Sequence, residues 1–221
     1  MRPAYSLALI LLALGAAGCA RRASLTQPND RLFAATAPDS FDVEMLTTKG
    51  PLVVRVRRDW SPRGADRFYA LVRQGFFTDV AFHRTIRNFV AQFGIHGDPA
   101  VSAAWNGRTI PDDTVRTSNT RGTLSFARGN ANTRSTQLYF NLVDNARLDT
   151  ANTFGFPPIG RVIQGLSVLD SLNWEYSGTR GGQEFPGPRQ DSLRLQGNAY
   201  LHRSFPRLDY IVRTRIVRTF R

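Results

Sequence analysis

The 221-residue sequence predicts a mainly β protein, a closed antiparallel barrel whose ends are covered by two helices. Three observations support this fold class. Many short segments rich in apolar residues lie between turns that contain glycine and proline, which is typical of strands. Only two segments carry apolar residues at clear helical spacing. A hydrophobic content of 42% in a chain of this length is enough for one domain with a real core, but not for two large ones.

Residues 1–18 are typical of a secretory signal peptide. Arg2 precedes an apolar run at residues 7–14, and small residues then lead to Cys19. A basic start, a short apolar stretch and a small-residue exit define such peptides, and the run is too short to span a bilayer comfortably. The segment AAGC at residues 16–19 resembles a bacterial lipobox, although alanine replaces the leucine favoured at its first position. We therefore expect Cys19 to be the lipidated first residue of the mature chain.

Cys19 is also the only cysteine, so the chain cannot form an internal disulfide. Lipidation would explain why an exported chain retains this single thiol, and it would anchor the chain to a membrane. The alternative is an ordinary signal peptide with an incidental cysteine. Residues 19–40 are interpreted as the lipidated N-terminus and a polar, flexible tether. The residue after Cys19 is Ala20 and not the aspartate that is associated with inner-membrane retention, which slightly favours the outer membrane. We expect the protein in the cell envelope, facing the periplasm or the cell exterior.

The folded part is expected to begin at residue 41 with a β-hairpin. Residues 41–46 alternate apolar and polar side chains, as a half-buried strand does. Residues 48–51 (TKGP) are typical of a turn, and residues 52–57 alternate again. Two such segments joined by a short turn predict an antiparallel pair.

The clearest helix follows the hairpin. Ser61 is a residue type that caps helix N-termini, and Pro62 is tolerated at the first helical position. Apolar side chains recur at helical spacing from Ala65 to Val72. Gly75 is then a typical helix stop.

Short strands are predicted at residues 81–84, 89–93, 123–127, 138–142 and 160–162. A long polar loop is predicted at residues 94–121, and loops of that length are usually functional or specific insertions. Residues 112–113 (DD) within it are expected to be solvated. Leu166, Leu169 and Leu172 share one face of a second short helix.

The C-terminal part carries three further elements. Residues 173–188 are rich in glycine and proline and predict a loop. Residues 190–203 could carry a short helix, and residues 208–217 predict a final strand. We interpret residues 173–207 as a C-terminal extension within a single domain that spans residues 41–221.

The formal net charge is +12, and Lys49 is the only lysine. The arginines are scattered without a dense basic run, so we expect no nucleic-acid partner; diffuse attraction to acidic lipids or cell-envelope polymers fits better. His83, His96 and His202 are not at metal-ligand spacing with cysteines or acids. No G-x-S-x-G motif or phosphate-binding glycine loop occurs. We therefore expect neither a metal nor a cofactor.

Five segments resemble, in order and at nearly the family's spacing, the motifs of cyclophilin-type peptidyl-prolyl cis/trans isomerases. They are FHRTIRNFVAQFG at residues 82–94, GTLSFA at 122–127, NTRSTQLYF at 132–140, LD at 148–149 and IGRVIQG at 159–165. The family patterns are F-H-R-x-I-x-x-F-x-x-Q-x-G, G-x-L-S-M-A, N-T-N-G-S-Q-F-F-I, L-D-G and F-G-K-V-x-x-G. The resemblance covers residues 41–172 and a last strand near the C-terminus. It implies a closed eight-stranded antiparallel barrel capped by two helices, with the activity EC 5.2.1.8.

The reaction that this resemblance implies breaks no bond. Rotation about an X–Pro bond meets a barrier of about 18–20 kcal/mol, because the imide has partial double-bond character. In the twisted transition state conjugation is lost, and the prolyl nitrogen regains a localised lone pair. A donor aimed at that nitrogen binds the twisted form better than the planar one, which is differential binding. No nucleophile, metal or general base is required.

The resemblance places Arg84 at the family's catalytic position. Its guanidinium is always charged and has a fixed set of donors, and Gln92 would hold Arg84 or a substrate carbonyl. The positions implied for substrate binding are Phe89, Val90, Ala127, Arg128, Gln137, Tyr139, Leu148 and Phe156. The apolar ones could instead belong to the barrel core, and Arg84 could be a solvated surface arginine.

Three departures from the family pattern concern this site. Arg128 and Gly129 replace the usual A-N-A continuation, but the family's substrate contact there is mostly through the backbone. Arg147 stands where many members have a tryptophan that contributes to binding cyclosporin, which puts drug sensitivity in doubt. The family's pocket histidine has no clear counterpart, and Phe156 could close the pocket instead.

The expected partners are proline-containing segments of unfolded or exported proteins, bound by a monomer. A non-catalytic cyclophilin-fold module, which binds peptides or acts as a chaperone at the envelope, is the alternative. Arg128 and Arg147 keep that alternative open, whereas the retained site residues favour the enzyme. A structural envelope lipoprotein would explain the anchor but not the motifs.

Overall fold

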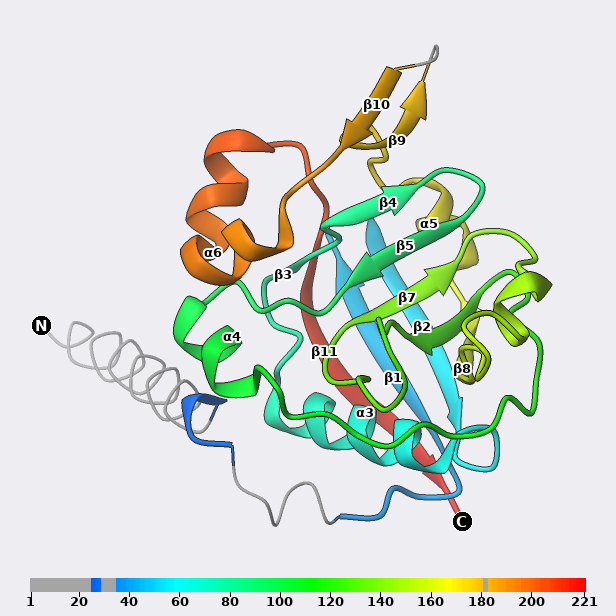
Figure 1. Cartoon of the computed structure of the whole chain (residues 1–221). Coiled ribbons are helices and arrows are strands. Elements are labelled where there is room, and N and C mark those ends of the chain that lie inside the picture. The colour runs from blue at the N-terminus through cyan, green and yellow to red at the C-terminus, as the bar shows by residue number, and fades with distance from the viewer. Residues whose placement is uncertain (1–24, 29–34, 181–182) are drawn as a thin grey trace, which may run out of the picture.

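The computed structural model describes residues 25–28, 35–180 and 183–221 (Figure 1). The predicted signal peptide and Cys19 lie outside the described residues. The strands are β1 (Ser40–Thr47), β2 (Gly50–Arg57), β3 (Val80–Ala81), β4 (Arg84–Ile86), β5 (Val90–Phe93), β6 (Thr123–Phe126), β7 (Leu138–Asn141), β8 (Pro158–Gln164), β9 (Ser177–Arg180), β10 (Gln183–Pro186) and β11 (Tyr210–Phe220). The helices are α3 (Pro62–Gln74), α4 (Pro99–Trp105), α5 (Leu166–Asp170), α6 (Gln190–Ser204) and the 3₁₀ helix η1 (Ala146–Asp149).

One curled antiparallel sheet dominates the described part of the chain. Its nine strands follow the order β3-β11-β1-β2-β8-β6-β7-β5-β4, and β9 and β10 form a separate hairpin. The mainly β prediction is confirmed, but the closed eight-stranded barrel is not, because the edge strands β3 and β4 are not paired with each other. The predicted strand at residues 81–84 is split, since β3 pairs with β11 and β4 pairs with β5.

Helix α3 packs against β2, β8 and β11 and helps to form the main core. Its first residue is Pro62, and Gly75 ends it in the left-handed conformation with φ 70°, as the sequence predicts. Phe68 of α3 stacks on Phe41 of β1 with ring centroids 6.5 Å apart, and contacts Phe77 at 5.5 Å. These aromatic contacts fix the helix on the sheet that carries the site.

A carboxylate from a distant loop, rather than Ser61, caps the N-terminus of α3. The Ser61 side chain makes no capping bond; its hydroxyl donates instead to Asp113 Oδ2 at 2.6 Å, and the Gly64 backbone N–H donates to the same oxygen at 3.0 Å. Arg134, fully buried, donates to this oxygen at 3.0 Å and lies 3.1 Å from Asp112 Oδ1. Burial alone would raise the pKa of Asp113, but these hydrogen bonds and Arg134 together lower it. The expectation that residues 112–113 are solvated is therefore wrong.

The segment predicted as the loop 94–121 contains a helix. Asp98 caps α4 by accepting from the backbone N–H of Ala100 at 2.9 Å. Trp105 at the end of α4 packs edge-on against Phe76, with centroids 5.1 Å apart. The helix is short, and a sequence of only seven residues offers little periodicity from which to predict it.

The C-terminal extension folds against the sheet beside α4 (Figure 1). The helix predicted at residues 190–203 is confirmed as α6. The structure adds a kink at Gly197, whose φ is 60°. A Cβ there would lie 2.1 Å from the carbonyl oxygen of Gly97, so only glycine allows α4 and α6 to approach this closely. The predicted loop at residues 173–188 is partly wrong, because the hairpin β9–β10 occupies most of it.

The predicted tether contacts the domain at two points. Leu25 and Ala37 are both buried and belong to the main core. The indole N–H of Trp105 donates to the carbonyl oxygen of Leu25 at 2.9 Å. Among the described residues, no helix combines the length and apolar character needed to cross a bilayer.

Acid should destabilise the fold through His83, which lies between β3 and β4. Burial above all, together with the charges of Arg194 and Arg84, lowers the pKa of this ring to about 3 from an ordinary 6.5. Between pH 6.5 and 3, His83 is protonated in the unfolded chain but stays neutral in the folded chain. The contribution of His83 to folding stability is therefore complete above pH 6.5 and falls as the pH drops toward 3. We predict that His83→Gln removes about 1.4 kcal/mol per pH unit from the slope of unfolding free energy against pH in this window.

Urea unfolding of parent and variant at several pH values between 4 and 7.5 measures this slope. The value at pH 7.5 gives the effect of the side-chain change itself. Parallel curves for the two proteins down to pH 4 would contradict the assignment of this acid sensitivity to His83.

Candidate active site

Strand register brings the polar residues of the site onto one face of the sheet. Arg84 of β4 lies directly opposite Gln92 of β5, and Gln92 lies opposite Tyr139 of β7. Tyr139 in turn lies opposite Ser125 of β6. Side chains of directly opposed residues share one face of a sheet, so the hydrogen-bond ladder itself aligns these four residues in a row.

A hollow of 180 Å³ lies over this row. Its lining comes from nine residues that the sequence analysis selects, namely Arg84, Phe89, Val90, Gln92, Ala127, Arg128, Tyr139, Leu148 and Phe156. The tenth, Gln137, adjoins them, since its Oε1 accepts from Gln92 Nε2 at 2.9 Å. An apolar cavity of about 150 Å³ can bind benzene, so this hollow has room for a five-membered ring.

The guanidinium of Arg84 is held at the edge of this hollow. Its Nη1 donates to Gln92 Oε1 at 3.2 Å, and the residue is half-buried. Burial lowers the pKa of Arg84 from its ordinary value, but an arginine remains charged at neutral pH. A charged group with several donors and one fixed hydrogen bond can direct its remaining N–H groups at a ligand in the hollow.

Asn119, which no motif identifies, organises the floor of the hollow. Its Oδ1 accepts from Ser125 Oγ at 2.9 Å and from the Tyr139 hydroxyl at 3.2 Å. Its Nδ2 donates to Asp149 Oδ1 at 2.8 Å and to the carbonyl oxygen of Phe156 at 2.9 Å. The Tyr139 hydroxyl therefore has the partner that its burial requires. Asn119 lies in the long loop, where the sequence carries no local signal for these contacts.

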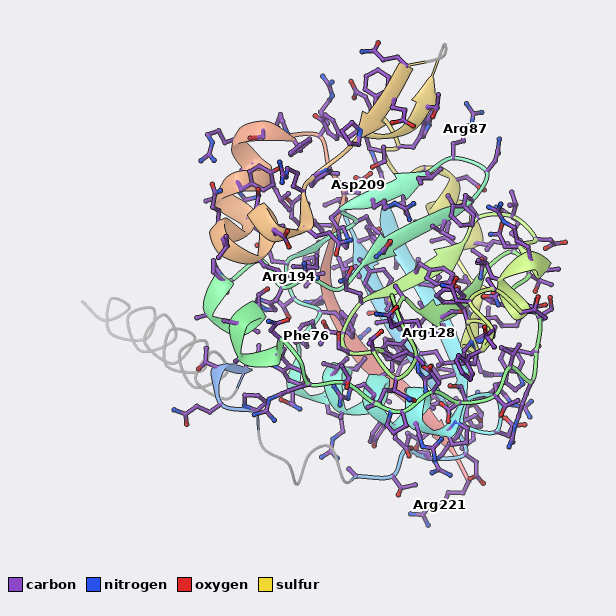
Figure 2. The ribbon with its side chains drawn as sticks, viewed as in Figure 1. Phe76, Arg87, Arg128, Arg194, Asp209 and Arg221 are labelled. Carbon is purple, nitrogen blue, oxygen red and sulfur yellow. The ribbon has the colours of Figure 1, made fainter. Side chains whose placement is uncertain are left out.

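Arg128, labelled in Figure 2, attaches the segment after η1 to the wall of the hollow. Its side chain is only 1% exposed and lies 3.7 Å from Asp112 Oδ2. Its Nη2 donates to the carbonyl oxygen of Gly155 at 2.7 Å, and its guanidinium lies 5.0 Å from the ring centroid of Phe156. Arg128, which departs from the family pattern, therefore holds Phe156 in place at the wall of the hollow.

Arg147, the second departure, lies on the outer side of the hollow. Its guanidinium is 4.7 Å from the ring centroid of Phe89, and the residue is exposed. A guanidinium at this distance attracts the ring face. Arg147 therefore supports one aromatic wall rather than entering the hollow.

A larger hollow of 510 Å³ lies elsewhere, between the β4–β5 connection and α5. The residues that line it include Thr85, Arg87, Arg121, Asp170 and Trp174. Arg121 is already paired with Asp170 at 2.8 Å. None of the residues that the sequence selects lies there, and the smaller hollow combines an apolar seat with directed donors, which is what a ligand site needs.

Comparison with known proteins finds one matching family model and several relatives. The family model described as Cyclophilin type peptidyl-prolyl cis-trans isomerase/CLD matches residues 42–189. A peptidyl-prolyl cis-trans isomerase of Acinetobacter baylyi is 31% identical over 143 residues, which cover 64% of this chain and 76% of the relative. Peptidyl-prolyl cis-trans isomerase B of Escherichia coli is 28% identical over 157 residues, which cover 68% of this chain and 94% of the relative.

Solved structures share the fold. A cyclophilin type peptidyl-prolyl cis-trans isomerase of Cryptosporidium parvum aligns with a TM-score of 0.57 and 19% identity, covering 82% of this chain and 99% of the other. The structure of that protein in the presence of the dipeptide Ala-Pro gives the same TM-score and identity, with 80% and 99% covered. At this identity the likeness concerns the fold alone.

The contacts of Arg128 predict its contribution to stability. Arg128→Ala removes a charged hydrogen bond to Gly155 and the ring contact with Phe156, so we expect the free energy of unfolding to fall by about 2–3 kcal/mol. Chemical denaturation measures the change. Arg218→Ala is the matched control, because that exposed guanidinium also lies over a phenylalanine, 4.8 Å from the ring centroid of Phe220. Equal losses in the two variants would contradict a special role for Arg128.

Proposed function

This chain belongs to the cyclophilin-type peptidyl-prolyl cis-trans isomerases and has their isomerase activity (EC 5.2.1.8), and we propose from this premise how and where it acts. The proposed mechanism is a hydrogen bond from Arg84 to the prolyl nitrogen in the twisted transition state. The proposed substrates are X–Pro bonds in exported proteins. The observation that carries the mechanism is the half-buried guanidinium of Arg84, fixed by Gln92 at the rim of an apolar hollow.

The energetic demand on this site is modest. The uncatalysed barrier is about 18–20 kcal/mol, and each ~1.4 kcal/mol removed accelerates rotation tenfold. A rate enhancement of about ten thousandfold therefore needs about 5–6 kcal/mol. Donors already oriented toward the twisted nitrogen stabilise it without reorganising during rotation.

The hollow supports the seating of a proline. Phe89, Leu148 and Tyr139 form apolar walls around a space that suits one small ring. Gln92 and Gln137 lie beside it and could bind the peptide backbone on either side of the proline. The dipeptide Ala-Pro in the Cryptosporidium parvum structure supports a proline-containing ligand for this chain as well.

Arg84→Ala should abolish most of the activity. Loss of one preorganised donor costs about a hundredfold or more in kcat where it acts on the transition state, and we expect that loss in a proline-peptide exchange assay on the full-length chain. Arg87→Ala is the matched control, because Arg87 is exposed and lies on the β4–β5 connection, far from Arg128 (Figure 2). Arg84→Ala should keep the parent's circular dichroism spectrum.

Two results would overturn the mechanism. Equal rates for the parent and Arg84→Ala would show that the guanidinium does not act on the reaction. Proline-peptide binding with no acceleration in the parent would instead favour a non-catalytic peptide-binding module at the cell envelope.

We propose that this enzyme lies in the cell envelope, anchored through a lipid on Cys19. The lipobox-like segment at residues 16–19 supports the anchor. Leu25 supports a short connection, because it is buried in the domain core only six residues after Cys19. Six residues can span at most about 20 Å, so the domain would stay close to the membrane surface and to chains that emerge there.

Cys19→Ser should release the protein from membranes. Lipid chains provide the membrane affinity through their buried methylenes, so we expect the parent in the membrane fraction of cells and the variant in the soluble fraction. Immunoblots of separated fractions measure this distribution. A parent that is fully soluble, or a variant that remains membrane-bound, would contradict the anchor.

A further inference from the structure

A line of hydrogen-bonded side chains connects the catalytic arginine to the C-terminal extension. Arg84 Nη1 donates to Gln92 Oε1 at 3.2 Å, and Gln92 Nε2 donates to Gln137 Oε1 at 2.9 Å. Gln137 Nε2 then donates to Gln190 Oε1 at 3.2 Å, and Arg194 Nη2 donates to the same oxygen at 3.2 Å. The last two residues belong to α6, which lies beyond the segment matched by the family model.

We propose that Gln190 of α6 is a positioning residue for the isomerase site, acting on Arg84 through Gln137 and Gln92. The inference rests on the proposed role of Arg84. It assigns to the C-terminal extension a part in the reaction that the family-matched segment does not contain.

The directions of the hydrogen bonds explain why Gln190 matters. A guanidinium can only donate, whereas each glutamine amide has one acceptor side and one donor side. Arg194 therefore fixes Gln190 with its oxygen toward both neighbours, Arg194 and Gln137. That oxygen requires Gln137 to present its NH₂ group, and Gln137 must then present its oxygen to Gln92. Gln92 is left with its oxygen toward Arg84, which is the only orientation that can hold a guanidinium.

A reversed amide would oppose catalysis. If Gln92 turned over, its NH₂ group would face the donors of Arg84, and the two groups would repel each other. The guanidinium would then lose the hydrogen bond that aims it at the hollow. Because the apolar seat for the ring does not depend on these amides, a disturbed line should lower kcat more than it raises KM.

Helix α6 is attached firmly enough to act as a fixed end. Leu193 and Leu201 are fully buried in a second core with Ala81 and Ile95. The backbone N–H of Asn198 donates to the carbonyl oxygen of Gly97 at 2.9 Å. Ala81 and Ile95 lie on either side of the β4–β5 pair in the chain, so α6 is packed on the same part of the sheet that carries Arg84 and Gln92.

Variants at residue 190 test the proposal in the full-length chain. Gln190→Ala removes the acceptor, and we expect kcat to fall about three- to tenfold, the effect of one hydrogen bond, with a smaller rise in KM. Gln190→Glu keeps acceptor oxygens for both donors and should restore kcat to within about twofold of the parent. Gln190→Lys presents only donors and should lower kcat at least as much as alanine. Gln196→Ala, an exposed glutamine of the same helix, is the matched control.

A second readout follows the amides directly. In ¹⁵N spectra, the side-chain NH₂ signals of Gln92 and Gln137 should shift in Gln190→Ala and Gln190→Lys but stay near the parent positions in Gln190→Glu. Thermal unfolding checks that α6 remains attached in each variant of residue 190. A variant that detached α6 would lose the second core and show a lower Tm than the parent.

The outcomes separate this inference from the proposed function. An inactive Arg84→Ala together with a fully active Gln190→Ala would overturn the role of Gln190 alone. Equal losses in Gln190→Ala and Gln190→Glu would also overturn it, because the acceptor would then be irrelevant. An active Arg84→Ala would instead overturn the proposed mechanism.

Discussion

The hydrogen bond between Arg84 and Gln92 is the interaction on which the site depends. Its two partners are directly opposed across β4 and β5, so backbone pairing sets their separation before any side chain is placed. A guanidinium is long and flexible, and without a fixed acceptor it would sample many orientations in water. The sheet therefore holds the two residues rigidly, and the hydrogen bond to the Gln92 amide fixes the orientation of the Arg84 guanidinium.

Buried polar contacts hold the walls around that pair. Asn119 connects strands β6 and β7 to the carbonyl of Phe156, and Arg134 connects the carboxylates that follow Pro111 to the start of α3. Each of these polar groups would be costly to bury without its partner. The long loop of residues 94–121 is consequently a structural part of the site, although its polarity suggests an exposed connection.

Local signals predicted the local features. The alternation of residues 41–57 and the stop at Gly75 anticipated the first hairpin and α3, because a period and a turn are set by neighbouring residues. The family motifs, with Arg128 and Phe156 beside them, identified ten residues that gather at one hollow and its edge. Asn119, the cap formed by Asp113 and the contact from Gln190 were not predictable, since each joins segments distant in sequence and leaves no pattern in either one.

The central claim is that the Arg84 guanidinium is aimed at the amide of a bound proline. A crystal structure of the chain with an Ala-Pro peptide measures this most directly. The account predicts the ring between Phe89, Leu148 and Tyr139, with a guanidinium nitrogen within about 3 Å of the prolyl amide group and Gln92 still accepting from Arg84. A peptide seated elsewhere, or a guanidinium turned away from a ring in this hollow, would contradict it.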